Sequence, residues 1–156
     1  MGGQVDIREK IIESTQEIFS SMVMMEISAL EELVTEGRVH TQSITGLIGL
    51  AGTYKGVLAI HMPNKVAMAV TSSFLGMDVE EINADVEDAI GELANMLGGN
   101  VKTILSESGR DISLSLPSTI SGQEYNFQLA SEAAERTVIC FESQAGRFHV
   151  ELQLEK

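Results

Sequence analysis

The pattern of apolar and polar residues along the chain predicts an alternation of helices and strands. From about Val5 to Met25, apolar residues recur at the three- and four-residue spacing of an amphipathic helix. A loop rich in Glu and Gly follows, through Glu36-Gly37-Arg38. From His40 to Met62, branched apolar residues alternate with Ser, Thr and Gly on both sides of Thr53-Tyr54, which predicts a β-hairpin. Its glycines, Gly46, Gly49 and Gly52, indicate bends or close approach of another backbone.

Two helices are predicted after this hairpin. Lys65 to Leu75 has helical spacing and is followed by Gly76, the residue type expected at a helix C-cap. Asn83 is a candidate N-cap for the next and longest helix, which runs to about Ser106. The acidic residues in the first turns of this helix suit the positive end of its dipole.

The remaining segments are predicted to be strands. ISLSLPSTI, which follows Gly109, alternates like a strand, and Pro117 within it indicates a sheet edge or an interruption. Two further strands, about Glu135–Glu142 and Arg147–Leu154, flank Gln144-Ala145-Gly146 and form a hairpin. This order predicts an α+β fold with helices packed on one face of an antiparallel sheet. We expect a single domain over residues 1–156, with its core at about 5–154.

The charge balance argues against two classes of partner. The chain has 10 basic and 23 acidic residues, a net charge of −13, so a nucleic acid or an anionic membrane surface would be repelled. The basic residues are scattered and Trp is absent, which disfavours a base-stacking surface. No segment approaches ~18 uninterrupted apolar residues, and the N-terminus lacks the apolar run of a signal peptide. A lone cysteine, Cys140, in a strand-like segment suits a reducing compartment, so we expect a cytoplasmic protein.

Signatures of common enzyme classes are missing from the sequence. The three histidines, His40, His61 and His149, lack the spacing of metal ligands, so no metal site is expected. A nucleophile elbow and a Walker loop are also absent.

The predicted long helix has an unusual polar face. At about 100° per residue, its apolar residues gather on one side and a second group of residues gathers on the other. The apolar side contains Ile90, Leu93, Leu97, Val101 and Ile104, and the opposite side contains Asp88, Glu92, Asn95 and Gly99. Asn is a poor helix former, and each glycine of the pair 98–99 costs ~1 kcal/mol relative to Ala in a helix interior. We therefore expect something other than helix stability to explain these residues, with Gly99 allowing close approach of another surface.

The motif Asp88-x-x-x-Glu92-x-x-Asn95 resembles the signature helix of the CheC/CheX/FliY family of chemotaxis phosphatases, whose motif is Asp or Ser, three residues, Glu, two residues, Asn. The order of predicted elements over most of residues 5–154 is also similar to that of CheX. CheC-type members carry a second motif on the first helix, where this chain has Glu17 and, at the position of the Asn, Ser20. A serine hydroxyl cannot present the paired donor and acceptor of a carboxamide at the reach of an asparagine side chain. The resemblance therefore implies one active site per chain, the CheX pattern, with Glu17 an ordinary surface residue.

The resemblance implies a protein phosphatase that hydrolyses the aspartyl phosphate of a CheY-like response regulator. Asn95 would orient the attacking water, Glu92 would dock the receiver domain, and Asp88 would play a supporting part. The phosphorylated receiver would hold Mg²⁺ with its own carboxylates, so this chain needs no cofactor. The resemblance also implies a homodimer formed through sheet edges, although Pro117 can equally blunt an edge.

Two other classes of function stay open at this stage. A non-catalytic adaptor or motor-associated module of the same fold would bind a receiver without hydrolysing its phosphate. A small-molecule sensor is the third class, although no convergent polar pocket can be read from the sequence.

Overall fold

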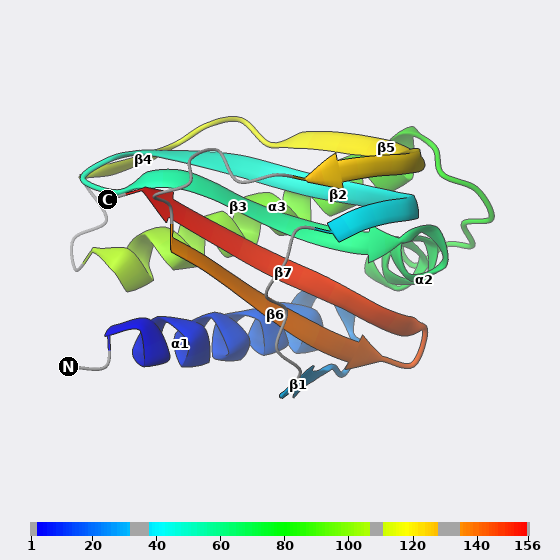
Figure 1. Cartoon of the computed structure of the whole chain (residues 1–156). Coiled ribbons are helices and arrows are strands. Elements are labelled where there is room, and N and C mark those ends of the chain that lie inside the picture. Colours follow the sequence, from blue (N-terminus) through cyan, green and yellow to red (C-terminus); the bar gives the residue numbers. More distant parts are fainter. Residues whose placement is uncertain (1–2, 32–37, 107–110, 128–134, 156) are drawn as a thin grey trace.

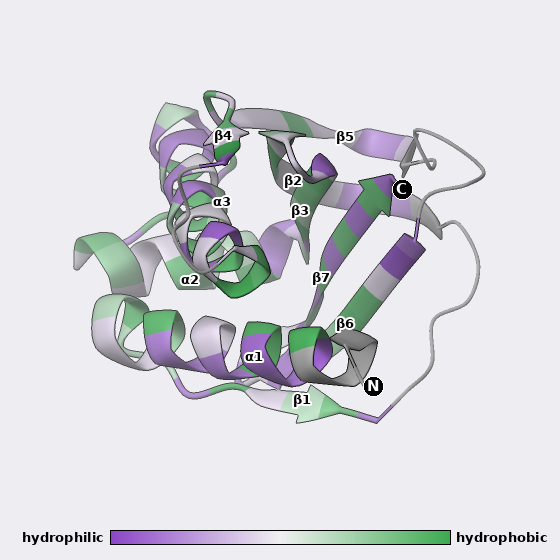
Figure 2. Ribbon diagram, turned by 90° about the vertical axis from the view of Figure 1, so that its left-hand side faces the viewer, coloured by the Kyte–Doolittle hydropathy of each residue, from purple (hydrophilic) through white to green (hydrophobic). Residues whose placement is uncertain are grey.

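The strands form a seven-stranded antiparallel sheet, and the helices pack on one of its faces (Figures 1 and 2). The computed structural model describes residues 3–31, 38–106, 111–127 and 135–155. Its helices are α1 (Gly3–Ile18), the π-helical turn η1 (Phe19–Val23), α2 (Asn64–Leu75) and α3 (Ala84–Leu105). Its strands are β1 (Ser28–Leu30), β2 (Arg38–Gly52), β3 (Lys55–Pro63), β4 (Ile112–Leu114), β5 (Ser118–Phe127), β6 (Glu135–Ser143) and β7 (Gly146–Glu155). The predicted α+β class is confirmed.

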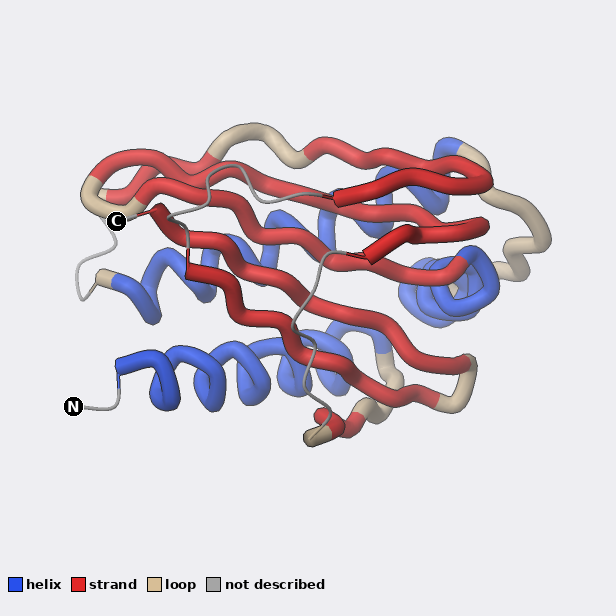
Figure 3. The backbone as a smooth tube through the Cα atoms, in the orientation of Figure 1, coloured by secondary structure: helices blue, strands red, loops and turns tan. Residues whose placement is uncertain are grey.

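The strand order is β1-β6-β7-β3-β2-β4, with β5 also paired to β2. The long strand β2 carries β4 and β5 one after the other along the same edge, because β4 pairs with residues 50–52 and β5 with residues 38–47. The interruption between them, residues 115–117, is drawn in tan in Figure 3. It includes Pro117, whose missing N–H favours such a break. The predicted interruption at Pro117 is thus confirmed.

Two glycines let α3 approach β2 closely. A Cβ atom added at Gly46 of β2 would lie 2.8 Å from the main-chain oxygen of Ile90 in α3. A Cβ atom at Gly98 of α3 would lie 3.0 Å from Cγ2 of Ile48 in β2. Larger residues would push the helix away from the sheet, so these glycines set the position of α3. The close approach expected of Gly46 is therefore confirmed.

The core fills the space between the helices and the sheet. Phe19 stacks on Phe148 with ring centroids 5.1 Å apart, and Phe148 stacks on Phe141 at 5.3 Å. Each of these rings is at most 1% exposed. Burying aromatic area of this size is a large favourable term in folding, so the stack ties η1 to β6 and β7. Cys140, the neighbouring residue in β6, is buried on the opposite face of the sheet, because successive side chains of a strand alternate.

The structure differs from the predicted elements in three places. The first helix changes to π-helical geometry at Phe19 and ends before Met24, whose φ of 61° is left-handed. The short strand β1, paired with β6, lies in a segment predicted to be a loop. The predicted strand ISLSLPSTI is divided between β4 and β5, and β5 continues to Phe127. Residues 36–37 of the predicted loop and Gly109 lie outside the described residues.

Candidate functional site

Helix α3 is firmly positioned by its cap and its apolar stripe. Asn83 is the N-cap, as predicted, and its side-chain oxygen accepts a hydrogen bond of 3.1 Å from the backbone N–H of Val86. Asp85 and Glu87 lie in the first turn, where the helix dipole favours negative charge. The predicted apolar stripe is buried, with Ile90, Leu93, Leu97 and Val101 each at most 1% exposed and Ile104 packed against the core. The opposite side of α3 is therefore held in a fixed orientation toward solvent.

The predicted site residues lie together on this solvent-facing side. Asp88 and Glu92 are exposed, whereas Asn95 and Gly99 are partly buried. Glu92 and Asn95 are three residues apart, which places their Cβ atoms roughly 5–6 Å apart on one face of the helix. Within the described parts of the chain, no hydrogen bond or ion pair engages the side chains of Glu92 or Asn95. A carboxylate and a carboxamide are thus both available to another molecule.

The two adjacent glycines of α3 have different surroundings. A Cβ atom at Gly99 would meet no atom within 4 Å, so this position opens onto free space. Gly98, by contrast, packs against Ile48 and needs no functional explanation. For Gly98, the explanation beyond helix stability is therefore its packing against the sheet. For Gly99, the open surroundings agree with a surface that admits another molecule.

The corresponding part of the first helix has no such pair. Glu17 of α1 and Ser20 of η1 are both exposed. The hydroxyl of Ser20 donates a hydrogen bond of 3.2 Å to the main-chain oxygen of Glu17, so it is occupied by its own helix. This arrangement agrees with one site per chain, located on α3.

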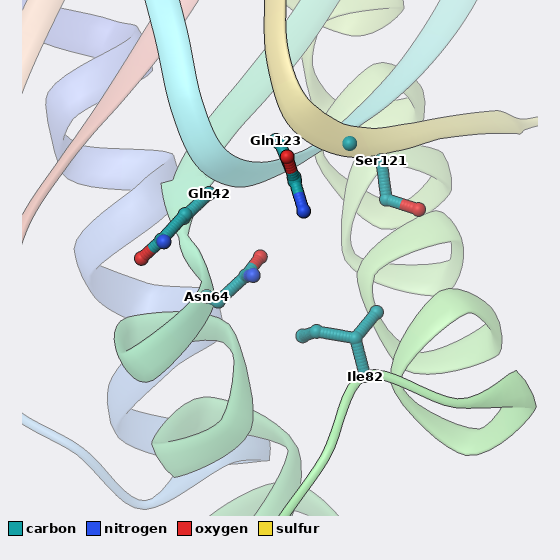
Figure 4. Close-up of a pocket in the computed structure, with 6 residues that line it drawn as sticks. Gln42, Asn64, Ile82, Ser121 and Gln123 are labelled. Carbon is teal, nitrogen blue, oxygen red and sulfur yellow. The ribbon is translucent and has the colours of Figure 1, made fainter.

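A polar hollow lies near the N-terminal end of α2, which the sequence does not reveal (Figure 4). Its volume is about 270 Å³; the side chains of Asn64, Gln123 and Ile82 point into it, and Gln42, Ser121 and Gly122 also line it. Gln42 has a left-handed φ of 43°, and the side-chain oxygen of Asn64 is buried without a hydrogen-bond partner among the described residues. The hollow lies before the first turn of α3, because Ile82 precedes the N-cap Asn83, whereas Asn95 lies about three turns into the helix.

A second polar cluster crosses the sheet on the face away from the helices. Glu151 of β7 accepts hydrogen bonds from His61 Nε2 at 3.0 Å, Arg136 Nε at 2.7 Å and Gln153 Nε2 at 2.9 Å. Thr45 Oγ1 lies 2.8 Å from His61 Nδ1 and thereby completes a row of hydroxyl, imidazole and carboxylate. Such a row occurs in acyl-transfer enzymes. Here Thr45 is 0% exposed and cannot reach a substrate, so we interpret the cluster as structural.

The buried carboxylate is stabilised in its charged form. Burial alone would raise the pKa of Glu151, but the hydrogen bonds from His61, Arg136 and Gln153 outweigh it and lower the pKa from 4.5 to about 2. Burial raises the pKa of Tyr125, whose hydroxyl lies 2.7 Å from Thr45 Oγ1, and that hydrogen bond offsets part of the rise. The cluster therefore joins β2, β3, β5, β6 and β7 through hydrogen bonds.

The predicted surface or structural role of the histidines holds in part. His61 and His40 are buried, and their rings stack with centroids 4.2 Å apart. Groups of three or more His, Cys, Asp or Glu side chains suited to a metal ion are not found among the described residues. Of the helices described, none has the length and apolar character to cross a membrane.

Comparison with known proteins gives a consistent result. The family model described as chemotaxis phosphatase CheX matches residues 44–142, which include all of α3. A CheY-P phosphatase CheX from Thermotoga maritima is 29% identical over 83 residues, which cover 53% of this chain and 54% of that protein. The match thus spans about half the length of this curated relative.

Two solved structures have the same fold over nearly their whole length. A chemotaxis protein CheX from Desulfovibrio desulfuricans is 27% identical, with a TM-score of 0.84 and coverage of 96% of this chain and 99% of that one. The CheX of a CheX–CheY–BeF₃–Mg²⁺ complex from Borrelia burgdorferi is 18% identical, with a TM-score of 0.76 and coverage of 95% and 97%. The second comparison concerns the fold alone.

Proposed function

Because this chain belongs to the CheX family of chemotaxis phosphatases, we propose that it hydrolyses the aspartyl phosphate of a CheY-like response regulator on the polar face of α3. The observation that carries this proposal is the placement of Glu92 and Asn95, one helical turn apart on the solvent-facing side of a fixed helix and without side-chain partners among the described residues. The proposal treats the chain as one domain with its core at about residues 5–154. The single sheet, whose strands extend from Ser28 to Glu155, supports a one-domain chain.

Asn95 is the residue proposed to act on the water molecule. A neutral carboxamide is no general base, but its oxygen accepts a hydrogen bond from one hydrogen of water. Water held in this way has its oxygen directed at the phosphorus, in line with the bond to the aspartyl oxygen. The partly buried position of Asn95 supports this role, because a side chain with restricted motion orients water at a smaller entropic cost.

Glu92 is proposed to dock the receiver domain. Its exposed carboxylate can form a charge-assisted hydrogen bond with a lysine of the receiver, and such contacts fix geometry as well as adding affinity. Asp88, one turn earlier, adds negative charge beside it and has a supporting part. Mg²⁺ belongs to the receiver in this proposal, and the related Borrelia burgdorferi complex contains CheY, BeF₃ and Mg²⁺ together with CheX. No cofactor is assigned to this chain.

A turnover assay separates this function from that of a non-catalytic adaptor. A CheY-like receiver domain is phosphorylated with labelled phosphate, and the release of label is followed with one protein molecule per fifty receivers or so. A phosphatase accelerates the release of label at this ratio, because each molecule acts repeatedly. An adaptor or motor-associated module would bind the receiver without accelerating it, and that result would reject the proposal.

Replacing Glu92 with Gln should weaken docking more than chemistry. The loss of a charge-assisted contact predicts that KM for the phosphorylated receiver rises about tenfold, with a smaller change in kcat. Raised salt should weaken binding of the unaltered protein in the same direction. Steady-state kinetics paired with direct binding measures both. Glu17→Gln is the matched control, because it removes the same charge from an exposed position on α1; a fall in kcat at unchanged affinity for Glu92→Gln would assign Glu92 a chemical role instead.

Replacing Gly99 with Leu should separate stability from activity. The open space at this position and the poor helix propensity of Gly predict that the melting temperature is unchanged or raised. The free energy of unfolding should increase by at most ~1 kcal/mol. The added side chain should obstruct the receiver and lower kcat/KM. Thermal unfolding and the dephosphorylation rate are measured on the same sample. Gly99→Ala is the control of smaller volume, which should keep more activity; a Leu variant of full activity would show that the receiver does not approach this position.

We also propose a homodimer formed through a sheet edge. Among the described strands, β5 pairs with β2 alone, and residues 120–124 are exposed. Unpaired backbone groups along such an edge can extend the sheet into a second copy. The molar mass in solution, measured by light scattering over a range of concentrations, tests this association.

A further inference from the structure

The connection between β4 and β5 runs along α3 beside Asn95. A Cβ atom at Gly98 would lie 3.7 Å from Leu114, whereas one at Gly91 would lie 3.8 Å from Pro117. Asn95 lies between these two glycines, four residues after Gly91 and three residues before Gly98, on the same side of the helix. The residues between Leu114 and Pro117 therefore pass Asn95 and form one wall of the candidate site.

This wall carries a prominent apolar side chain. Leu116 is 87% exposed, more than any other large apolar residue in the described part of the chain. Its backbone is nevertheless held in place, because Ser115 N–H donates to the Gly49 oxygen at 2.9 Å and Gly49 N–H donates to Ser115 Oγ at 2.8 Å. Pro117 restricts the chain on the other side of Leu116. Because the backbone is already fixed, binding a partner at this side chain costs little additional backbone entropy.

We infer that Leu116 is an apolar anchor for the same phosphorylated receiver domain that docks on α3. This inference rests on the proposed function and adds a third contact to it. Glu92 would bind a lysine and Asn95 would hold the water, while Leu116 would bury an apolar patch next to the phosphorylation site of the receiver. The occupant is a receiver rather than a small molecule, because the wall contacts α3 on both sides of Asn95, so a receiver seated on Glu92 and Asn95 would lie beside the exposed Leu116. Central apolar anchors of this kind commonly dominate the affinity of protein interfaces.

The test compares two exposed leucines. Leu116→Ser should raise KM for a receiver phosphorylated with acetyl phosphate about tenfold and leave kcat within about twofold of the original value. Leu75→Ser is the matched control, because Leu75 is 44% exposed at the end of α2, and it should leave both constants unchanged. Leu116→Met should restore most of the affinity, since it restores apolar area. A KM for Leu116→Ser equal to that of Leu75→Ser would overturn the inference.

Direct binding keeps this inference distinct from the proposed function. Binding of a BeF₃- and Mg²⁺-loaded receiver is measured for the unaltered protein and for both serine variants, without reference to hydrolysis. If Leu116→Ser weakens binding but the unaltered protein does not accelerate phosphate release, the anchor role of Leu116 is supported and the proposed phosphatase activity is rejected. If the unaltered protein accelerates phosphate release and the two serine variants bind the receiver with equal affinity, the phosphatase activity is supported and the anchor role of Leu116 is rejected.

Discussion

Replacing Asn95 with Ala should lower kcat for dephosphorylation on the order of 10²-fold, the typical effect of losing a positioning group. The loss should fall on kcat more than on KM, because the carboxamide is proposed to act on water and not on the receiver. Asn95 is only partly buried and its side chain has no partner among the described residues, so the fold should be unaffected. Single-turnover loss of label at saturating receiver measures the chemical step directly.

The control for this variant is Asn100→Ala. Asn100 is also partly buried on α3, but it lies about 140° around the helix from Asn95. The rate for Asn100→Ala should stay within about twofold of the original. Hydrolysis by Asn95→Ala at nearly the original rate, with the same melting temperature, would remove the proposed mechanism.

Of the substitutions proposed for this protein, Glu151→Ala should lower the free energy of unfolding the most. The change leaves the buried His61 and the mostly buried Arg136 facing each other without their carboxylate. Breaking a buried ion pair in this way lowers the free energy of unfolding by about 3 kcal/mol. Urea unfolding at neutral pH measures the change. Glu142→Ala is the control, because its pair with Arg147 is more than half exposed, and it should change the free energy by less than about 1 kcal/mol.

The same carboxylate should give a distinct dependence on pH. Its pKa is lowered on folding, from 4.5 to about 2, so its contribution is complete above pH 4.5 and is lost as the pH falls toward 2. The difference in unfolding free energy between the unaltered protein and Glu151→Ala should therefore shrink over this range. The difference isolates Glu151 from the many other carboxylates, which titrate in both proteins. A difference that stayed constant between pH 5 and 2 would contradict the lowered pKa.

The sequence was sufficient to predict the helix that carries the candidate site. The period of its apolar residues fixed which side of α3 is buried, and Asn83 marked where the helix begins. Both signals depend on residues close together in the sequence, and the structure that they favour is kept in the folded protein when tertiary packing agrees with it. The roles of Asn95 and Glu92 came from resemblance to a family, since no local pattern distinguishes a catalytic carboxamide from a solvated one.

The features that were missed depend on contacts between distant segments. Glu151 lies in an alternating strand, where its position reads as solvent-exposed, and only the pairing of β7 with β3 and β6 brings His61 and Arg136 to it. The hollow at Gln42 and Asn64 likewise combines several segments. Strand β1 has three residues, too few to show a period. The wall beside Asn95 is located by the contacts of Gly91 with Pro117 and of Gly98 with Leu114. The spacing of residues along the sequence does not reveal these contacts.

The central place of β7 in the sheet has a consequence for how the protein is made. Strands β1 and β6 form one part of the sheet and β3, β2, β4 and β5 form the other, and of the described strands β7 alone pairs with both parts. Because β7 follows the other described strands in chain order, the two parts cannot join before β7 has been synthesised. Until then each part has an open edge, which is prone to wrong pairing and aggregation. The sheet can therefore be completed only after its most C-terminal described strand has been made, and its two parts are exposed to wrong pairing until that point.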